Sequence, residues 1–239
     1  MADDRLIVAL DVHTFSDARM LIDELGDDVS FYKVGMELFY SVGEKVLTYL
    51  NEKNKKIFLD LKLHDIPNTV AGGLCSLLQY KVSMVNVHAS GGYTMMKTAK
   101  ERLCDAAKRN GVEPPKIIAV TVLTSMNDDD WKKIGETEKI SDRVIRLASL
   151  AKEAGLDGVV ASPEEASSIR ETCGDDFFIV TPGIRPIGSS VDDQSRISSP
   201  GAAIKNGATH IVVGRPIRMA SDPKIATKNI LAEMGGIAV

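Results

Sequence analysis

The chain has 239 residues, of which 44% are hydrophobic and 26% charged, and its 29 basic and 33 acidic side chains leave a formal net charge of -4. This composition excludes a disordered chain, and the negative charge disfavours nucleic-acid binding through bulk attraction, so any bound anion must be held by a few placed cations. No run of about 18 apolar residues, the length of a membrane span, occurs in the sequence.

The three cysteines, Cys75, Cys104 and Cys173, are widely spaced and form neither a CxxC pair nor a cluster with histidines. We therefore expect no disulfide framework and no structural zinc site, and we predict reduced, buried thiols in a cytoplasmic protein. The acidic segment after Met1 leads directly into a strand-like segment and lacks the features of a signal peptide.

Short apolar runs alternate along the chain with longer segments of helical periodicity. The expected strands are residues 6–10, 31–34, 57–59, 84–87, 117–120, 158–161, 177–180 and 210–213. The expected helices are residues 17–25, 43–53, 68–80, 93–109, 140–154, 163–172, 200–206 and 222–234. Ser16 and the pair Ser162-Pro163 are helix-start signals, and Gly155 and Gly207 are helix-stop signals.

Apolar strands that alternate with helices are typical of parallel strands covered by helices. Eight strand–helix units in this length leave about 30 residues for each, the size of one unit in a closed barrel. A doubly wound sheet usually has a glycine-rich first turn, whereas residues 11–15 contain no glycine. We therefore predict an α/β protein with one domain, residues 1–239, folded as a (β/α)8 TIM barrel.

Charged and polar residues follow the expected strands at the points where these end. They are Asp11, Lys33, Asp60, Lys62, His88, Thr124, Arg185, Gly214 and Arg215. In TIM barrels the catalytic groups lie at the carboxyl ends of the strands and in the loops after them. These residues therefore predict an active site at one rim of the barrel.

The third strand and the residues after it carry both charges. Because side chains alternate along a strand, Phe58, Asp60, Lys62 and His64 should point into the barrel, and the leucines between them should point outward. Lys33 should face inward from the neighbouring strand. Opposite charges in a barrel mouth are costly to desolvate unless they are paired, and such an array is more typical of a functional site than of packing.

The loops after the seventh and eighth strands, residues 181–185 and 212–217, contain glycine and arginine. This is the usual phosphate site of TIM barrels, where backbone amides and a bidentate arginine hold the anion. The residues alone thus predict an enzyme that acts on a phosphorylated small molecule without a metal or a redox cofactor. They leave open whether a lysine donates a proton or forms a Schiff base.

Residues 60–69, Asp-Leu-Lys-Leu-His-Asp-Ile-Pro-Asn-Thr, resemble the DxKxxDIPxT signature of the orotidine 5'-phosphate decarboxylase family in its short bacterial form. Similar segments are residues 7–11, 31–39, 85–89, 119–125, 181–185 and 211–217, so the resemblance extends from about Leu6 to the last helix. The DxKxxD part is shared with sugar-phosphate relatives, whereas the IPxT continuation and the Gly-Arg loop make the match specific.

The resemblance implies a cofactor-free and metal-free conversion of orotidine 5'-phosphate to uridine 5'-phosphate and carbon dioxide. It implies that Lys62 donates the proton to carbon 6 of the pyrimidine. Lys33, Asp60 and Lys62, with Asp65 from a second subunit, would form an array of alternating charges.

The resemblance also assigns the residues that contact the substrate. Asp11 and Lys33 would contact the ribose, Thr124 the base, and Gln194, Gly214 and Arg215 the phosphate, with Arg185 nearby. Ile66 and Thr69 would complete the neighbouring subunit's site. A homodimer with shared active sites follows from this assignment.

Two other functions compete with this interpretation. One is a metal-dependent relative with the same DxKxxD frame, such as a 3-keto-gulonate phosphate decarboxylase or a hexulose phosphate synthase. The other is a non-catalytic barrel that binds nucleotides as a regulatory or scaffold protein. The second would need a broken charged array, whereas Lys33, Asp60, Lys62 and Asp65 are all present.

Overall fold

The computed structural model describes residues 2–186 and 198–236. Within these residues, eight strands form a closed parallel barrel in chain order, and β8 pairs with β1 to close it. The strands are β1 (Leu6–Ala9), β2 (Phe31–Gly35), β3 (Lys56–Leu63), β4 (Met84–His88), β5 (Lys116–Val120), β6 (Gly158–Val160), β7 (Phe178–Thr181) and β8 (His210–Val213). The predicted TIM barrel is confirmed.

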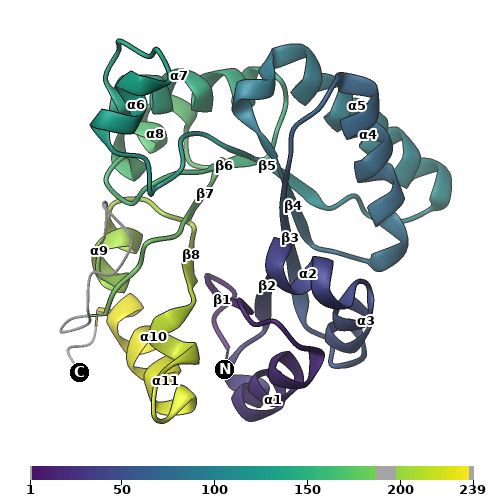
Figure 1. Ribbon diagram of the computed structural model, residues 1–239, viewed down its shortest axis with the longest axis vertical. Helices are drawn as coiled ribbons and strands as arrows, with labels where there is room; N and C mark the ends of the chain where they lie inside the picture. The colour runs from purple at the N-terminus through teal and green to yellow at the C-terminus, as the bar shows by residue number, and fades with distance from the viewer. Residues whose placement is uncertain (1, 187–197, 237–239) are drawn as a thin grey trace.

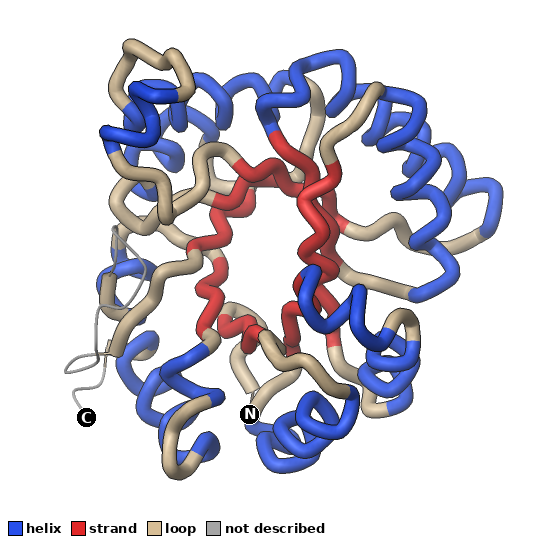
Figure 2. Tube along the Cα trace, in the orientation of Figure 1, coloured by secondary structure: helices blue, strands red, loops and turns tan. Residues whose placement is uncertain are grey.

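Helices form a ring outside the strands, as Figure 2 shows. They are α1 (Phe15–Leu25), α2 (Met36–Val42), α3 (Lys45–Glu52), α4 (Pro67–Ser76), α5 (Gly92–Asn110), α6 (Asp128–Lys133), α7 (Ile140–Glu153), α8 (Ala166–Cys173), α9 (Pro200–Lys205), α10 (Arg215–Arg218) and α11 (Pro223–Met234). Figure 1 shows that α10 and α11 follow β8 and lie on the side of the barrel where β1 begins. In the described part of the chain, no helix combines the length and the apolar character needed to cross a membrane.

The strands separate two apolar clusters. The inner one fills the barrel and consists of Ile7, Ala9, Phe31, Phe58, Met84, Ile118, Val180 and Val212. The outer one lies between strands and helices and includes Val8, Tyr32 and Leu59, which are the sequence neighbours of inner residues. Alternation along each strand therefore directs every second side chain into the barrel. The same alternation carries polar residues inward where the strands reach the mouth.

Several predicted helix limits were wrong, for local reasons. Helix α1 begins at Phe15 rather than after Ser16, because the Thr14 side chain accepts a hydrogen bond from the backbone N–H of Asp17 at 3.1 Å and caps the helix. Helix α8 begins at Ala166, three residues beyond Pro163, because the intervening residues form turns.

Other differences concern the segments beside β2 and β4. Helix α2 follows β2 directly and was not predicted, because its seven residues are too few to show a clear helical period. The helix expected over residues 68–80 is divided into α4 and the 3-10 turn Leu77–Tyr80. Strand β3 continues to Leu63, four residues beyond its predicted end.

Candidate active site

Lys33 and Asp60 lie on the neighbouring strands β2 and β3 and point into the barrel mouth, as the alternation predicted. They are 9% and 8% exposed. The Lys33 ammonium lies 2.8 Å from Asp11 Oδ1 and 3.5 Å from Asp60 Oδ2. The other carboxylate oxygen of Asp60 accepts a hydrogen bond from Lys62 Nζ at 2.6 Å. Asp11, Lys33, Asp60 and Lys62 therefore form a row of alternating charges across the first three strands.

The charges in this row stabilise one another in a buried setting. Burial by itself lowers the pKa of Lys33, but the negative charges of Asp60 and Asp11 outweigh this effect and raise it above its usual value. Burial likewise raises the pKa of Asp60, whereas Lys33, Lys62 and the hydrogen bond from Asn86 bring it below its usual value. Lys33 and Asp60 are thus held in their ionised forms, because each of these buried charges has opposite charges as neighbours.

The backbone around Lys62 departs from a regular strand. Between β3 and β4 the register pairs Leu59 with Val85 and Leu63 with Val87, so four steps along β3 face two steps along β4. Within this irregularity Lys62 has a φ of 51°, in the left-handed region that lysine rarely adopts. The backbone N–H of Lys62 donates to Asn86 Oδ1 at 2.8 Å. This conformation directs the lysine side chain back toward Asp60.

Asn86 is a site residue that the sequence reasoning did not identify. It is 1% exposed, and its Nδ2 donates to Asp60 Oδ1 at 2.7 Å. The available signal was its position two residues after Met84, which fills the barrel interior. By alternation Asn86 also points inward, and a buried amide needs partners for both of its ends.

Two adjoining cavities open beside this row. The first, of about 230 Å³, is lined by Lys33, Phe58, Asp60, Lys62, Val120, Val122, Leu123, Thr124, Ser125, Val160, Pro182 and Val212. The second, of about 380 Å³, is lined by Ala9, Asp11, Lys33, Glu37, Pro182, Gly183, Arg185, Val212, Gly214, Arg215 and Arg218. Lys33, Pro182 and Val212 border both cavities.

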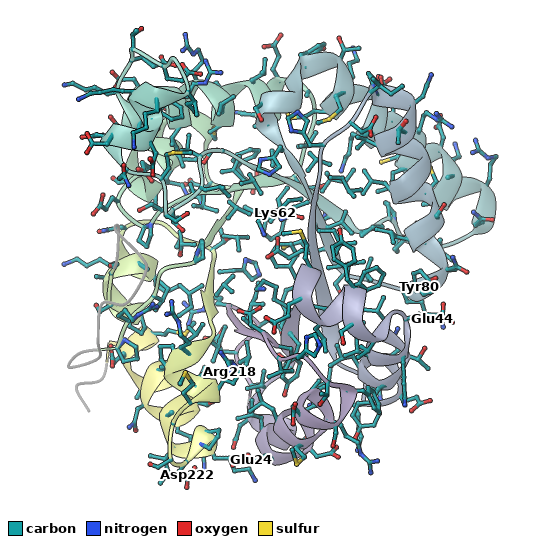
Figure 3. The ribbon with its side chains drawn as sticks, in the orientation of Figure 1. Glu24, Glu44, Lys62, Tyr80, Arg218 and Asp222 are labelled. Atoms are coloured by element: carbon teal, nitrogen blue, oxygen red, sulfur yellow. The ribbon has the colours of Figure 1, made fainter. Side chains whose placement is uncertain are left out.

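The cavities differ in chemistry. The first has apolar walls, with Lys33, Asp60, Lys62, Thr124 and Ser125 as its polar groups, which suits a flat base. The second contains three arginines, which suits a phosphate. Figure 3 labels Lys62 near the middle of the barrel and Arg218, which lines the second cavity, at α10. Gly35 leaves room for the Lys33 side chain where the two cavities meet. A Cβ atom at position 35 would lie only 3.0 Å from Lys33 Nζ.

The remaining predicted site residues lie elsewhere. Asp65, Ile66 and Thr69 are exposed, at the start of α4 or just before it, and border neither cavity. Gln194 lies outside the described residues. The inward placement of His64 was wrong: it is exposed because β3 ends at Leu63, and alternation no longer applies beyond the strand.

The histidines at this side of the barrel lie together and apart from the cavities. The rings of His64 and His88 lie 5.6 Å apart. Burial, helped by His64 and Lys62, lowers the pKa of His88 below its usual value. Among the described residues, no three His, Cys, Asp or Glu side chains are grouped so that they could hold a metal ion.

Comparison with known proteins agrees with this geometry. A family model described as "Orotidine 5'-phosphate decarboxylase / HUMPS family" matches residues 4–230. The orotidine 5'-phosphate decarboxylase of Carboxydothermus hydrogenoformans is 49% identical over 98% of this chain and 97% of its own length. The enzyme of the same name from Nostoc sp. is 45% identical over 98% of each chain.

Solved structures give the same result. A crystal structure of orotidine 5'-phosphate decarboxylase from Lactobacillus acidophilus has a TM-score of 0.85 and 44% identity, and the match covers 97% of this chain and 99% of that chain. The resemblance seen in residues 60–69 is thereby confirmed. The chain belongs to the orotidine 5'-phosphate decarboxylase / HUMPS family.

Proposed function

We propose that the protein decarboxylates orotidine 5'-phosphate to uridine 5'-phosphate, the last step of pyrimidine nucleotide synthesis, with Lys62 as the proton donor. The observation that carries the proposal is the Lys62 ammonium, held 2.6 Å from a buried carboxylate at a cavity that adjoins an arginine-lined one. Relatives 45–49% identical over nearly the whole chain are named for this activity, which supports it over the sugar-phosphate alternatives.

The two cavities suggest how the nucleotide lies. Its phosphate would bind Arg215, Gly214 and Arg185 in the second cavity. The sequence resemblance assigns Gln194 to the same phosphate. Its ribose would lie where the cavities meet, against Asp11 and Lys33. The pyrimidine would then enter the first cavity, with Thr124 at its edge and the carbon that loses the carboxylate beside Lys62.

The proposed step needs no cofactor. The bond from ring carbon 6 to the carboxylate breaks, its electron pair stays on the carbon, and carbon dioxide leaves. That pair then forms a C–H bond with a proton from Lys62 Nζ, and the neutral amine later regains a proton from water. The ammonium stabilises the developing negative charge more than it stabilises the substrate, and this difference accelerates the reaction.

Asp60 contributes through its charge. It is anionic beside the substrate carboxylate, so the two repel each other until carbon dioxide leaves. Its contact with Lys62 joins opposite charges, which suits a proton donor, whereas a Schiff base requires a neutral amine. Proton donation is therefore the better-supported of the two roles that the residues left open for the lysine.

Loss of the Lys62 ammonium tests this mechanism. In Lys62→Ala, the rate of decarboxylation, followed as the loss of orotidine 5'-phosphate absorbance, should fall by at least about a thousandfold. Both proton donation and charge stabilisation are lost in this variant. Lys100→Ala is a matched control. Lys100 also forms an ion pair of 2.6 Å, with Asp157, and its side chain is about as exposed as that of Lys62. Near-normal turnover in Lys62→Ala would contradict the mechanism. Activity abolished by a chelator would favour the metal-dependent alternative.

We further propose that the protein forms a homodimer. Asp65 and Thr69 are exposed beside the mouth, Ile66 is 67% exposed, and Tyr40 on α2 is 71% exposed. We propose that Asp65, Ile66 and Thr69 complete the site of a second copy. This arrangement would place another carboxylate beside Lys62 and cover apolar side chains.

Mixing two inactive variants tests the shared site. Lys62→Ala and Asp65→Ala should each be inactive as homodimers. After mixing and subunit exchange in equal amounts, half the dimers are mixed and one site in each is intact, so about a quarter of normal activity should appear. No recovery, with exchange verified by a mass tag, would refute the sharing of Asp65.

A cytoplasmic location belongs to the same proposal. The three cysteines are free thiols, and Cys173 is buried. Burial raises the pKa of Cys173 and keeps its thiol unreactive. Free thiols are usual in the reducing cytoplasm, where pyrimidine nucleotides are made.

A further inference from the structure

The buried amide of Asn86 joins the two charges on which the proposed reaction depends. Its oxygen accepts the backbone N–H of Lys62 at 2.8 Å, and its nitrogen donates to Asp60 Oδ1 at 2.7 Å. Asn86 lies on β4, and both partners lie on β3. One side chain therefore controls the backbone of the lysine and the carboxylate of the aspartate.

The first contact supports an unusual backbone. Because the register shifts between β3 and β4, the N–H of Lys62 bonds to this side chain rather than to a strand partner. A buried N–H must find an acceptor, and here the acceptor also holds Lys62 at its φ of 51°. The direction in which the lysine leaves the strand depends on that backbone angle.

The second contact orients the carboxylate. Asp60 Oδ1 receives Asn86 Nδ2 and Lys62 Nζ, and Oδ2 faces Lys33 Nζ at 3.5 Å. The amide thereby fixes the rotation of the carboxylate between the two ammonium groups. An amide is the group required, since one end must accept from a backbone N–H while the other donates to a carboxylate.

We propose that Asn86 is a positioning residue for the decarboxylation: it holds the Lys62 ammonium and the Asp60 carboxylate in the geometry that the reacting carbon requires. The inference rests on the proposed role of Lys62. Asn86 itself does not touch the nucleotide, because it borders neither cavity.

Substitution by alanine is the first test. In Asn86→Ala we expect kcat to fall about 100-fold, as for small displacements of catalytic groups. KM and the Kd of uridine 5'-phosphate should change less than about threefold, because ground-state binding is kept. Asn51→Ala is the matched control, since its amide also makes a 2.8 Å hydrogen bond, to the Tyr80 carbonyl. Asn51→Ala should lower thermal stability and leave kcat unchanged. The same result in Asn86→Ala would overturn the inference.

The pH profile separates positioning from packing. Without the amide, Asp60 loses a hydrogen bond that lowers its pKa, so the acidic limb of kcat in Asn86→Ala should move to higher pH. In Asn86→Asp, of nearly equal size, the added negative charge opposes Asp60 near neutrality. Once protonated, the added carboxyl can donate to Asp60, so activity relative to the parent should recover as pH falls.

These opposite responses keep the test valid if the alanine variant fails to fold. The inference would be overturned if every Asn86 variant that folds had the same pH profile of kcat as the parent. Normal turnover in Lys62→Ala would instead refute the mechanism itself. Loss of turnover in Lys62→Ala together with normal kcat in both Asn86 variants would refute only the role of Asn86.

A separate observation concerns Arg218 at the end of α10. Its side chain lines the second cavity together with Arg185 and Arg215. Figure 3 labels Arg218 at α10. Its Nε is buried and has no hydrogen-bond partner among the described residues. A buried donor without a partner is costly in a finished protein and suits a site completed by an anionic ligand.

We infer that Arg218 donates to the substrate phosphate and strengthens the enzyme's preference for phosphorylated nucleotides. This inference depends on the proposed position of the phosphate at Arg215. The cavity has basic Lys33, Arg185, Arg215 and Arg218 against acidic Asp11 and Glu37, so a phosphate dianion balances the excess positive charge.

Ligands with and without phosphate test this role. In Arg218→Gln the Kd of uridine 5'-phosphate should rise about tenfold or more, as for a lost hydrogen bond to a charged group. Turnover of orotidine, which lacks the phosphate, should be unchanged. Arg19→Gln removes an exposed arginine of α1 and serves as the charge control. An unchanged Kd, or equal losses with both ligands, would overturn the inference.

Arg215→Ala shows which assumption has failed. If it weakens uridine 5'-phosphate binding and Arg218→Gln does not, only the role of Arg218 is wrong. If neither variant affects binding, the phosphate lies elsewhere.

Discussion

Lys62 combines a charged side chain at the mouth with a strained backbone. A non-glycine residue at a φ of 51° costs about 1–2 kcal/mol relative to its preferred conformations. Such strain persists where surrounding contacts hold it, and it is concentrated at functional sites. Here the contacts are the hydrogen bonds to Asn86 and Asp60. The protein therefore gives up stability to hold the ammonium at the mouth, beside the Asp60 carboxylate.

Comparing two inactive variants isolates this strain. Lys62→Gly and Lys62→Ala both lose the ammonium, but only glycine adopts the left-handed conformation without steric cost. We expect Lys62→Gly to have the higher free energy of unfolding, by about 1 kcal/mol, in urea titrations. At Lys97, which lies inside α5, the glycine variant should instead have the lower free energy of unfolding of the two, because glycine destabilises a helix relative to alanine. Equal stability of the two Lys62 variants would show that the backbone relaxes without cost.

At the scale of secondary-structure elements, Arg170 joins the end of α8 to its neighbours. Its Nη1 donates to the carbonyls of Gly174, Asp175 and Phe177 at 2.6–2.9 Å, and its Nη2 donates to the carbonyl of Gly207 at 2.9 Å. One guanidinium thus satisfies carbonyls in the connection to β7 and in the turn after α9. These contacts hold the ends of α8 and α9 in place, at the side of the barrel away from the mouth.

Replacing Arg170 should affect stability and leave catalysis unchanged. Arg170→Met retains the length of the side chain but leaves the carbonyls unpaired, so the free energy of unfolding should fall by about 3 kcal/mol. Arg170→Lys should recover only part of this loss, because one ammonium cannot reproduce the planar fork. Arg146→Met, at a 61% exposed side chain, is the control. A change in kcat with unchanged stability would contradict this assignment.

In the molecule as a whole, the two ends of the barrel are built for different purposes. The mouth holds paired charges and open cavities, whereas the opposite end is closed by aromatic rings. His210 opens β8 there and lies 6.0 Å from Phe31 and 5.4 Å from Phe178, between ring centroids. It is therefore part of the barrel's closure. Burial, with a smaller effect from Lys56, lowers its pKa to about 4.

This histidine makes the barrel sensitive to acid. The unfolded chain binds a proton at His210 below about pH 6.5, whereas the folded protein does so only below about pH 4. Stability is therefore lost as pH falls through this window, by about 3 kcal/mol in total. Between pH 7 and pH 4, the free energy of unfolding measured in urea titrations should fall by about 3 kcal/mol less in His210→Gln than in the parent. The exposed His13→Gln is the control, and identical pH dependence in parent and His210→Gln would contradict the prediction.

Much of the fold and the site was predictable along the chain. The alternation of apolar strands and helices indicated the barrel, because each strand of a parallel sheet is buried on both faces. Alternation within β2 and β3 also indicated that Lys33, Asp60 and Lys62 point inward. The prediction failed where local rules cease to apply, as at His64 beyond the end of β3, and at the short helix α2.

The order of residues was sufficient to indicate which charges line the mouth and which arginine-bearing loops border it, because side-chain direction and strand order follow from local periodicity. The left-handed turn at Lys62 and the part played by Asn86 come from the pairing of β3 with β4. Residues 24 positions apart meet there through a register shift that no local pattern records. Closure of the opposite end by His210 likewise depends on contacts with Phe31 and Phe178, which only the closed barrel brings together.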